Sequence, residues 1–101
     1  MKRYRYVLEP EAQDDLERLY DFLLEFSPEI ADAALERIYA SLGTLEIIPH
    51  SCRKATSIDG KPLRELIINF GRSGYLALFE IRPDDVVLVL AIKHHRESDY
   101  H

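Results

Sequence analysis

Cysteine and long hydrophobic runs are scarce in this sequence. Cys52 is the only cysteine, so no disulfide can form within the chain, and a cytoplasmic location is the simplest expectation. No apolar run approaches the roughly 18 residues that a membrane-spanning helix needs. The first six residues, MKRYRY, lack the apolar stretch of a signal peptide. We therefore expect a cytoplasmic protein without a membrane segment.

Positive charge is scarce in the first half of the chain. Residues 1–50 carry 5 Lys and Arg against 11 Asp and Glu, a net charge of -6. Residues 51–101 carry 8 against 7, a net charge of +1. A chain with a net charge of -5 is not a general nucleic-acid binder, and its acidic first half argues against direct, specific DNA binding. Any cationic patch is expected in the second half.

Length and composition predict one small globular domain. A length of 101 residues is near the commonest domain size, and 47% hydrophobic and 31% charged residues are usual for a soluble protein. Internal repeats, low-complexity stretches and linker-like segments are missing from the sequence as well. Residues 1–101 are therefore interpreted as a single domain.

The first half predicts a short strand and two helices. Residues 4–8 alternate as a strand does, and Pro10 suits the first turn of a following helix. Ser27 and Pro28 then mark a second helix start, and Pro49 marks the end of that helix. The apolar positions at helical spacing are Ala12, Leu16, Leu19, Tyr20 and Leu23, and then Ala31, Ala34, Leu35, Ile38, Leu42 and Leu45. So few residues separate the helices that they must form an antiparallel hairpin.

Two large apolar side chains fall outside the first helical stripe. Phe22 and Phe26 come near the end of the first predicted helix. One interpretation is an exposed apolar strip on which a partner docks, and the other is a helix that the rest of a small domain encloses. Both interpretations stay open at this point.

The second half predicts three strands joined by short turns. Residues 49–62 form the longest connection, and Asp59-Gly60 indicates a tight turn within it. Strands are predicted at 63–70, 75–82 and 86–93, which makes an antiparallel meander. The unbroken apolar run from Val86 to Ile92 predicts a last strand that is buried on both faces, near the middle of the sheet. The order β-α-α-β-β-β predicts an α+β fold with the helical hairpin packed on one face of the sheet.

Ionisable side chains follow the last predicted strand at once. His94 or His95 could act as a base, Tyr100 could donate a proton, and Arg96 could hold a phosphate, so the composition permits cleavage of RNA. Other cations that could contact a target or a phosphate are Lys54, Lys61, Arg64 and Arg72. Structural roles are the alternative. One histidine would then face the core and the other solvent, Arg64 would be ion-paired, and the ring of Tyr100 would pack.

No metal or cofactor site is expected. His50, Asp59 and His101 are isolated along the sequence, and together with the single thiol of Cys52 they do not form a zinc-ligand pattern. No membrane contact is expected either.

The ordered set of elements and residues resembles the RelE/ParE superfamily of bacterial toxins, often labelled plasmid stabilisation proteins. The resemblance covers nearly the whole chain, and no single motif carries it alone. The residues that carry it are Leu8-Glu9-Pro10-Glu11-Ala12, Asp15-Leu16, Ser27-Pro28, Ala31, Leu45, Pro49, Leu63-Arg64-Glu65-Leu66, Gly74-Tyr75 and the ending Ile92-Lys93-His94-His95-Arg96-Glu97-Ser98-Asp99-Tyr100.

The resemblance implies the toxin of a type II toxin–antitoxin pair, which a small antitoxin neutralises by wrapping around it. Phe22 and Phe26 are then the expected antitoxin contacts, together with the sheet face or edge. In this superfamily the RelE branch cleaves mRNA on the ribosome, whereas the ParE branch poisons DNA gyrase. The resemblance alone leaves both activities open.

Two features of the sequence favour the ParE branch. RelE ribonucleases place an arginine directly after the Gly-Tyr pair of the middle strand, and here that residue is Leu76. They also carry a lysine-rich strand before it, where this chain has Leu66-Ile67-Ile68. We therefore predict a toxin that binds DNA gyrase and performs no chemistry itself. The alternatives are a ribosome-dependent endoribonuclease that uses His94, His95, Arg96 and Tyr100, and an inactive domain that acts as a co-repressor only together with its antitoxin.

Overall fold

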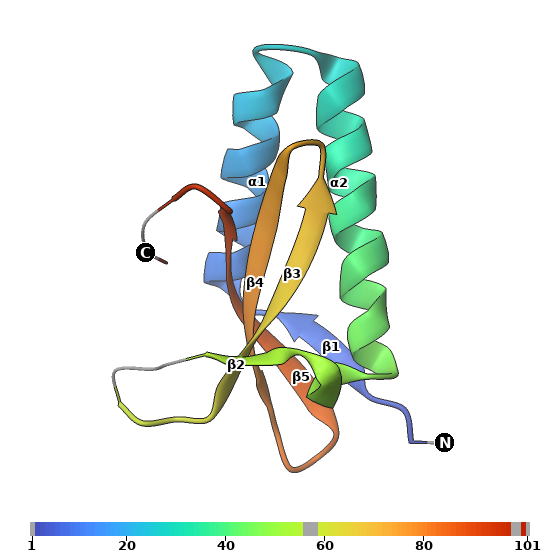
Figure 1. Cartoon of the computed structure of the whole chain (residues 1–101), viewed down its shortest axis with the longest axis vertical. Coiled ribbons are helices and arrows are strands. Elements are labelled where there is room, and N and C mark those ends of the chain that lie inside the picture. Colours follow the sequence, from blue (N-terminus) through green and yellow to red (C-terminus); the bar gives the residue numbers. More distant parts are fainter. Residues whose placement is uncertain (1, 56–58, 98–99, 101) are drawn as a thin grey trace.

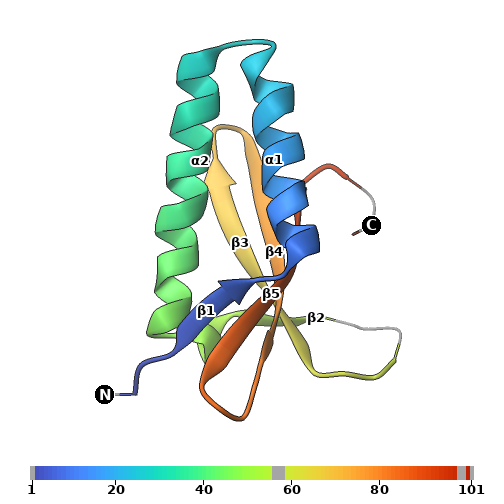
Figure 2. The same cartoon turned by 180° about the vertical axis from the view of Figure 1, so that it is seen from behind.

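The computed structural model describes residues 2–55, 59–97 and 100. It contains one five-stranded sheet in the order β1-β5-β4-β3-β2, and two helices that lie on one side of it (Figures 1 and 2). The elements are β1 (Arg5–Leu8), α1 (Pro10–Leu24), α2 (Pro28–Gly43), β2 (Arg53–Ala55), β3 (Leu63–Phe70), β4 (Ser73–Ile81) and β5 (Val86–His94). The predicted α+β fold, with a helical hairpin packed on a strand meander, is confirmed.

The sheet is mixed because its first strand joins its last. β1 runs parallel to β5, with Arg5 opposite Val86 and Leu8 opposite Val89, whereas β2, β3, β4 and β5 pair antiparallel in turn. β5 therefore lies between β1 and β4, and Val87, Val89 and Ile92 on it are completely buried. The predicted place of the last strand inside the sheet is confirmed. Its burial is not complete on both faces, because Leu88 and Leu90 are only partly buried.

The largest differences from the sequence prediction are at the end of the second helix and at the edge of the sheet, whereas other strand ends differ by one or two residues. The second helix ends at Gly43 instead of Pro49, and short 3-10 turns follow at Thr44–Glu46 and Pro49–Ser51. The connection predicted at 49–62 contains β2, which pairs with the start of β3 at the edge of the sheet. A three-residue strand made of Arg53, Lys54 and Ala55 carries no apolar alternation, so only its pairing with β3 defines it.

Local signals place the helices as expected. The Oγ of Ser27 accepts a hydrogen bond from the N–H of Ile30 at 3.2 Å, which caps α2, and Pro28 occupies its first position. The hydroxyl of Tyr20 on α1 donates to Asp32 on α2 at 2.6 Å, which ties the antiparallel hairpin together. No helix within the described part of the chain is long and apolar enough to cross a membrane.

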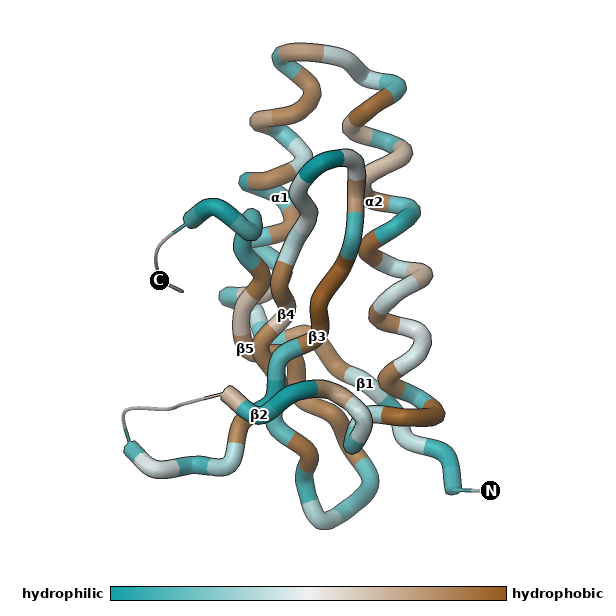
Figure 3. Tube along the Cα trace, in the orientation of Figure 1, coloured by the Kyte–Doolittle hydropathy of each residue, from teal (hydrophilic) through white to brown (hydrophobic). Residues whose placement is uncertain are grey.

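One hydrophobic core lies between the hairpin and the sheet. Figure 3 shows hydrophobic residues concentrated along β3, β4 and β5 and recurring at intervals along both helices. Leu42 on α2 and Phe79 on β4 are both completely buried in this core. Leu45, which we placed on the helical stripe, also reaches this core, but from the 3-10 turn that follows the helix.

An irregularity in β5 decides which side chains face this core. Leu78 pairs with Ala91, but Phe79 pairs with Val89, so Leu90 is an extra residue without a partner on β4. Such a bulge shifts the alternation of side chains by one residue. Before it, Val87 and Val89 face the helices, and after it, Ile92 does so. His94 therefore faces the helices as well, and Lys93 faces the opposite side.

Candidate functional site

The four tail residues predicted as one site are divided between the two faces of the sheet. His94 contacts Ser73 and Tyr75 on the side of the helices. Tyr100 contacts Glu65 and Lys93 on the side that the helices leave uncovered, which we call the open face. His95 and Arg96 lie exposed in the turn after β5. The single site expected from sequence is therefore not assembled, because the sheet separates His94 from Tyr100.

His94 is half-buried and hydrogen-bonded through both ring nitrogens. Its Nδ1 accepts the backbone N–H of Arg96 at 3.2 Å, and its Nε2 lies 3.1 Å from the Oγ of Ser73. An Nδ1 that accepts a hydrogen bond places the proton of the neutral ring on Nε2, which then donates to Ser73. Burial lowers the pKa of His94; Glu97 opposes this shift, and Arg96 and His95 add to it. The neutral form is thus favoured, and His95 is the solvent-exposed member of the pair.

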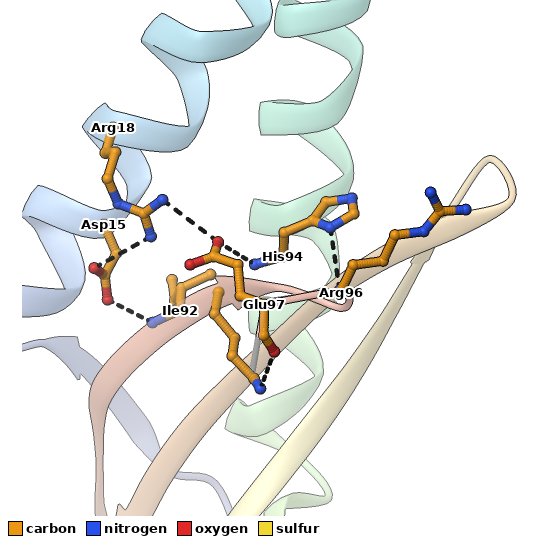
Figure 4. Close-up of polar contacts among 7 residues, drawn as sticks. Asp15, Arg18, Ile92, His94, Arg96 and Glu97 are labelled. Atoms are coloured by element: carbon orange, nitrogen blue, oxygen red, sulfur yellow. Dashed lines mark hydrogen bonds and ion pairs between the residues drawn. The ribbon is translucent and has the colours of Figure 1, made fainter. Parts of the chain in front are cut away.

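Two carboxylates accept hydrogen bonds from the part of the β5 edge that does not pair with β1 (Figure 4). The pairing with β1 ends at Val89, and Oδ2 of the buried Asp15 on α1 accepts the N–H of Ile92 at 2.8 Å. Glu97 Oε1 accepts the N–H of His94 at 3.0 Å. Arg18 lies between the two acids, 3.7 Å from Asp15 and 3.4 Å from Glu97. The turn after β5 is thereby fastened to α1.

Four residues form a cluster on the open face: Arg53, Glu65, Lys93 and Tyr100. Glu65 accepts a hydrogen bond from Arg53 Nε at 2.7 Å and another from the Tyr100 hydroxyl. The Nζ of Lys93 lies 4.9 Å from the centre of the Tyr100 ring. The cluster draws one residue each from β2, β3, β5 and the tail, so it exists only in the folded sheet. We refer to it as the open-face cluster.

The cluster holds opposite charges and a protonated phenol. Burial raises the pKa of Glu65. The hydrogen bonds from Tyr100 and Arg53, together with the charges of Arg53 and Lys93, outweigh this effect, so the pKa lies below its ordinary value. Burial, together with the bond to Glu65 and its charge, raises the pKa of Tyr100 far above 10.0, against a smaller opposing effect of Arg53. Glu65 is therefore an ionised acceptor and Tyr100 a hydrogen-bond donor.

The other predicted cations do not form one cluster. Arg64 Nη1 donates to the carbonyls of Cys52 at 2.7 Å and His50 at 3.1 Å, so it fastens the chain before β2 instead of pairing with a carboxylate. Lys54 is exposed on β2, Lys61 is exposed before β3, and Arg72 is exposed in the turn between β3 and β4. Lys54 and Arg64 are direct cross-strand partners on β2 and β3, whereas Lys61 and Arg72 lie elsewhere.

Phe22 and Phe26 form an exposed aromatic pair at the end of α1. Their side chains are 59% and 71% exposed, and their rings meet edge to face at 5.2 Å between centroids. Phe22 also lines a groove of about 550 Å³ between α1 and the ends of β4 and β5. The remaining lining residues are Arg18, Leu19, Leu23, Tyr75, His94 and Glu97. The enclosed-helix interpretation therefore does not hold for these two rings.

Sequence reasoning missed Glu65, Arg53, Lys93 and Asp15. The alternation of Leu66, Ile68 and Phe70 could have placed Glu65 on the open face, but its partner Arg53 lies on the unpredicted β2. The described residues contain no group of three or more His, Cys, Asp or Glu that could hold a metal ion. His101 lies outside the described part of the chain.

A comparison with solved structures shows the fold. A chain of the chromosomal ParDE toxin–antitoxin system from P. aeruginosa superposes with a TM-score of 0.74 at 20% identity, covering 91% of this chain and 96% of that one. A chain of the RelBE2 toxin–antitoxin complex from Mycobacterium tuberculosis gives a TM-score of 0.56 at 20% identity, covering 91% and 98%. Identities this low establish the fold alone.

Sequence comparison establishes the family. Toxin RelE3 of Caulobacter vibrioides is 32% identical over 90 residues, which cover 89% of this chain and 92% of the relative. Residues 6–99 match the family described as ParE toxin of type II toxin-antitoxin system, parDE. This match spans every helix and almost every strand residue described above. The chain therefore belongs to the ParE family and is a toxin of a type II toxin–antitoxin system.

Proposed function

We propose that this toxin acts by binding a large protein target, for which the family resemblance implies DNA gyrase, and that it does not cleave RNA itself. The observation that carries the proposal is Leu76 at the middle of the open face. It lies between Ile67 and Lys93 in the register of the sheet and is 5% exposed. Cleavage of RNA requires cations around the reacting phosphate, and an apolar residue in this central place supplies none.

The nearby cations also have partners. Arg53 is ion-paired with Glu65, and Lys93 Nζ donates to the backbone carbonyl of Glu97 at 2.7 Å. Recruiting either cation to a phosphate would break a contact that the free toxin already makes. A target that presents hydrogen-bonding and apolar groups to the open face meets no such cost.

The open-face cluster itself favours one second candidate, an RNA endonuclease. Glu65 is an ionised carboxylate that could accept the proton of a 2′-hydroxyl, and Tyr100 is a protonated phenol that could donate one. Arg53 and Lys93 lie on the same face and could hold phosphate if they exchanged partners. This candidate makes Glu65 and Tyr100 the acid–base pair, in place of the histidines. Both candidate targets lie in the cytoplasm, where we propose that the toxin acts.

The Tyr100→Phe variant separates the two candidates. It keeps the ring beside Lys93 and removes only the hydroxyl, so a gyrase-binding toxin should stay toxic, whereas a ribonuclease should lose about 10²-fold or more in cleavage. We would induce each toxin in cells, map transcript ends and score DNA breaks, and then measure supercoiling by purified gyrase with added toxin. Tyr39→Phe, at an exposed tyrosine of α2, is the matched control.

Two outcomes decide the proposal. DNA breaks with intact transcripts, caused equally by the wild type and Tyr100→Phe, would support gyrase as the target. Transcripts that are cut by the wild type and spared by Tyr100→Phe would establish the ribonuclease instead. A Glu65→Gln variant checks the second result, because it keeps the shape of the acceptor and removes its basicity.

We propose further that a cognate antitoxin covers the aromatic pair and the adjoining groove. Phe22 and Phe26 are more exposed than large apolar side chains usually are, and they continue into a groove lined by Leu19, Leu23 and Tyr75. α1 carries the acidic residues Glu11, Asp14, Asp15, Glu17 and Asp21, with Arg18 as its one cation. The occupant that fits this surface is an amphipathic segment whose apolar stripe is flanked by Lys and Arg.

Serine substitutions test this surface. Phe22→Ser and Phe26→Ser should each weaken antitoxin binding by about tenfold or more, since buried aromatic anchors dominate such interfaces. Binding of the purified proteins would be measured by calorimetry, with Glu25→Ser as a control at an exposed neighbour on the same helix end. Unchanged affinity in both aromatic variants would mean that the antitoxin binds another face of the toxin.

A further inference from the structure

A continuous series of contacts connects α1 to β2 around the end of β5. It begins with Asp15 and Arg18 on α1 and passes from Arg18 to Glu97. The backbone carbonyl of Glu97 accepts a hydrogen bond from Lys93, whose Nζ lies against the Tyr100 ring. Tyr100 donates to Glu65, and Glu65 pairs with Arg53. The groove on the side of the helices and the open-face cluster therefore share this series.

We propose that Arg18 and Glu97 are positioning residues that hold Lys93 and Tyr100 in the open-face cluster, and that an antitoxin segment in the groove strengthens this hold. The inference rests on the antitoxin surface proposed above. Arg18 and Glu97 border the groove on the helix side, but they would act on residues of the opposite face of the sheet.

Glu97 is the residue at which the two faces meet. Its carboxylate accepts the N–H of His94 and pairs with Arg18, while its backbone carbonyl holds Lys93. Its own N–H donates to the carbonyl of His94 at 3.0 Å, which closes the turn, and His95 N–H donates to Gly74 O at 2.8 Å. A turn fixed at this many points transmits a shift of the Glu97 side chain to its backbone, and so to Lys93.

The ion pair between Arg18 and Glu97 is weak in the free toxin and becomes stronger when a bound segment covers it. The side chains of Arg18 and Glu97 are 52% and 36% exposed, and water and salt screen such a pair. Both residues line the groove. An apolar segment placed there would exclude water, and a lower local dielectric strengthens the attraction between the two charges. The bound antitoxin would thus lock Tyr100 against Glu65 without touching either residue.

Nitration by tetranitromethane, which attacks the phenolate, reports the state of Tyr100. Peptide mass spectrometry would follow Tyr100 in the intact toxin, with exposed Tyr39 as an internal standard. Arg18→Ala and Glu97→Gln should speed nitration of Tyr100 about two- to fivefold, the range that an exposed ion pair can contribute. Arg18→Lys should restore the wild-type rate, and Arg37→Ala, at an exposed arginine of α2, should leave it unchanged. An unchanged Tyr100 rate in Arg18→Ala would overturn the inference.

Adding the intact antitoxin separates this inference from the proposed antitoxin surface. The antitoxin should slow nitration of Tyr100 in the wild type and have a much smaller effect in Arg18→Ala. Equal slowing in both would mean that the antitoxin covers Tyr100 directly, which overturns the coupling. The binding measurements on Phe22→Ser test the surface independently, so either idea can fail while the other stands.

Discussion

At the scale of single residues, Leu90 sets the surroundings of every side chain that follows it. Because it has no partner on β4, His94 turns toward the helices and Lys93 toward the open face. If Leu90 were paired with β4 in a regular register instead, the imidazole would join Tyr100 and the ammonium group would point into the groove. The chemistry available on each face therefore depends on one unpaired leucine.

His94 should make stability depend on pH. Its pKa in the folded toxin lies below the value of about 6.5 expected for the unfolded chain, mainly because of burial. The stabilisation is complete above the unfolded value and is lost as the pH falls from there through the folded value, since the unfolded chain binds the proton more readily. Urea unfolding between about pH 7.5 and about pH 5.5 should show this loss. His94→Gln should flatten this part of the profile, whereas His95→Gln should not; parallel profiles for wild type and His94→Gln would contradict the assignment.

The structural alternative for the two histidines agrees with the structure. The alternation of a strand end implied that one histidine faces the interior and the other solvent, and this is what the structure shows. The sequence does not reveal which histidine faces inward, because no residue in the apolar run marks Leu90 as the position of the bulge. Arg64 is predicted to contact a target or a phosphate, with an ion pair as the structural alternative. The ion pair is wrong, because Arg64 satisfies two backbone carbonyls that only the folded chain brings within reach.

At the scale of elements, the uncovered half of β5 depends on α1 for its hydrogen bonds. β1 is four residues long and pairs only as far as Val89, so the N–H groups beyond it need other acceptors. The carboxylate of Asp15 accepts the N–H of Ile92, and the carboxylate of Glu97 accepts the N–H of His94. An edge that is occupied in this way also resists pairing with a foreign strand.

Removal of Asp15 should destabilise the toxin through this edge. Asp15→Ala leaves the N–H of Ile92 without its acceptor in a buried place, which we expect to lower the free energy of unfolding by about 1–3 kcal/mol. Asp15→Asn keeps an acceptor oxygen and should lower it less. Asp14→Ala, at an exposed neighbour on the same helix, should change it by less than about 0.5 kcal/mol. Urea titrations would measure all three, and an Asp15→Ala protein as stable as Asp14→Ala would refute this explanation.

The elements that the sequence predicted best are those with strong periodicity and clear end signals. Ser27 and Pro28 begin α2 as expected, and the strand predicted at 63–70 has the bounds of β3. β2 was missed because its stability comes from pairing and not from its own residues. The hairpin tip between β3 and β4 depends on Gly74, since a Cβ there would lie 2.0 Å from the carbonyl oxygen of Ile68.

At the scale of the whole molecule, charge is distributed unevenly between the layers. The helical hairpin belongs to the half with a net charge of -6, and β2 to β5 belong to the half with a net charge of +1. A basic antitoxin segment would therefore be attracted toward the helices before contact.

Antitoxin association should accordingly slow as salt increases. Between about 50 mM and about 500 mM NaCl the association rate should fall several-fold, while the dissociation rate changes little, because screening acts mainly on the approach. Stopped-flow mixing would measure both rates. Asp21→Lys on α1 should slow association, and Lys54→Glu on β2 should not. A rate that does not depend on salt would contradict an electrostatically guided encounter with the hairpin.

The parallel pairing of β1 with β5 also affects how the toxin is synthesised. β5, which joins β1 to the meander, follows the other described strands along the chain, so the sheet lacks an interior strand until β5 has been synthesised. The N-terminal hairpin can leave the ribosome early, but it has no complete core to pack against. We therefore expect the sheet of the toxin to form only after β5 has left the ribosome.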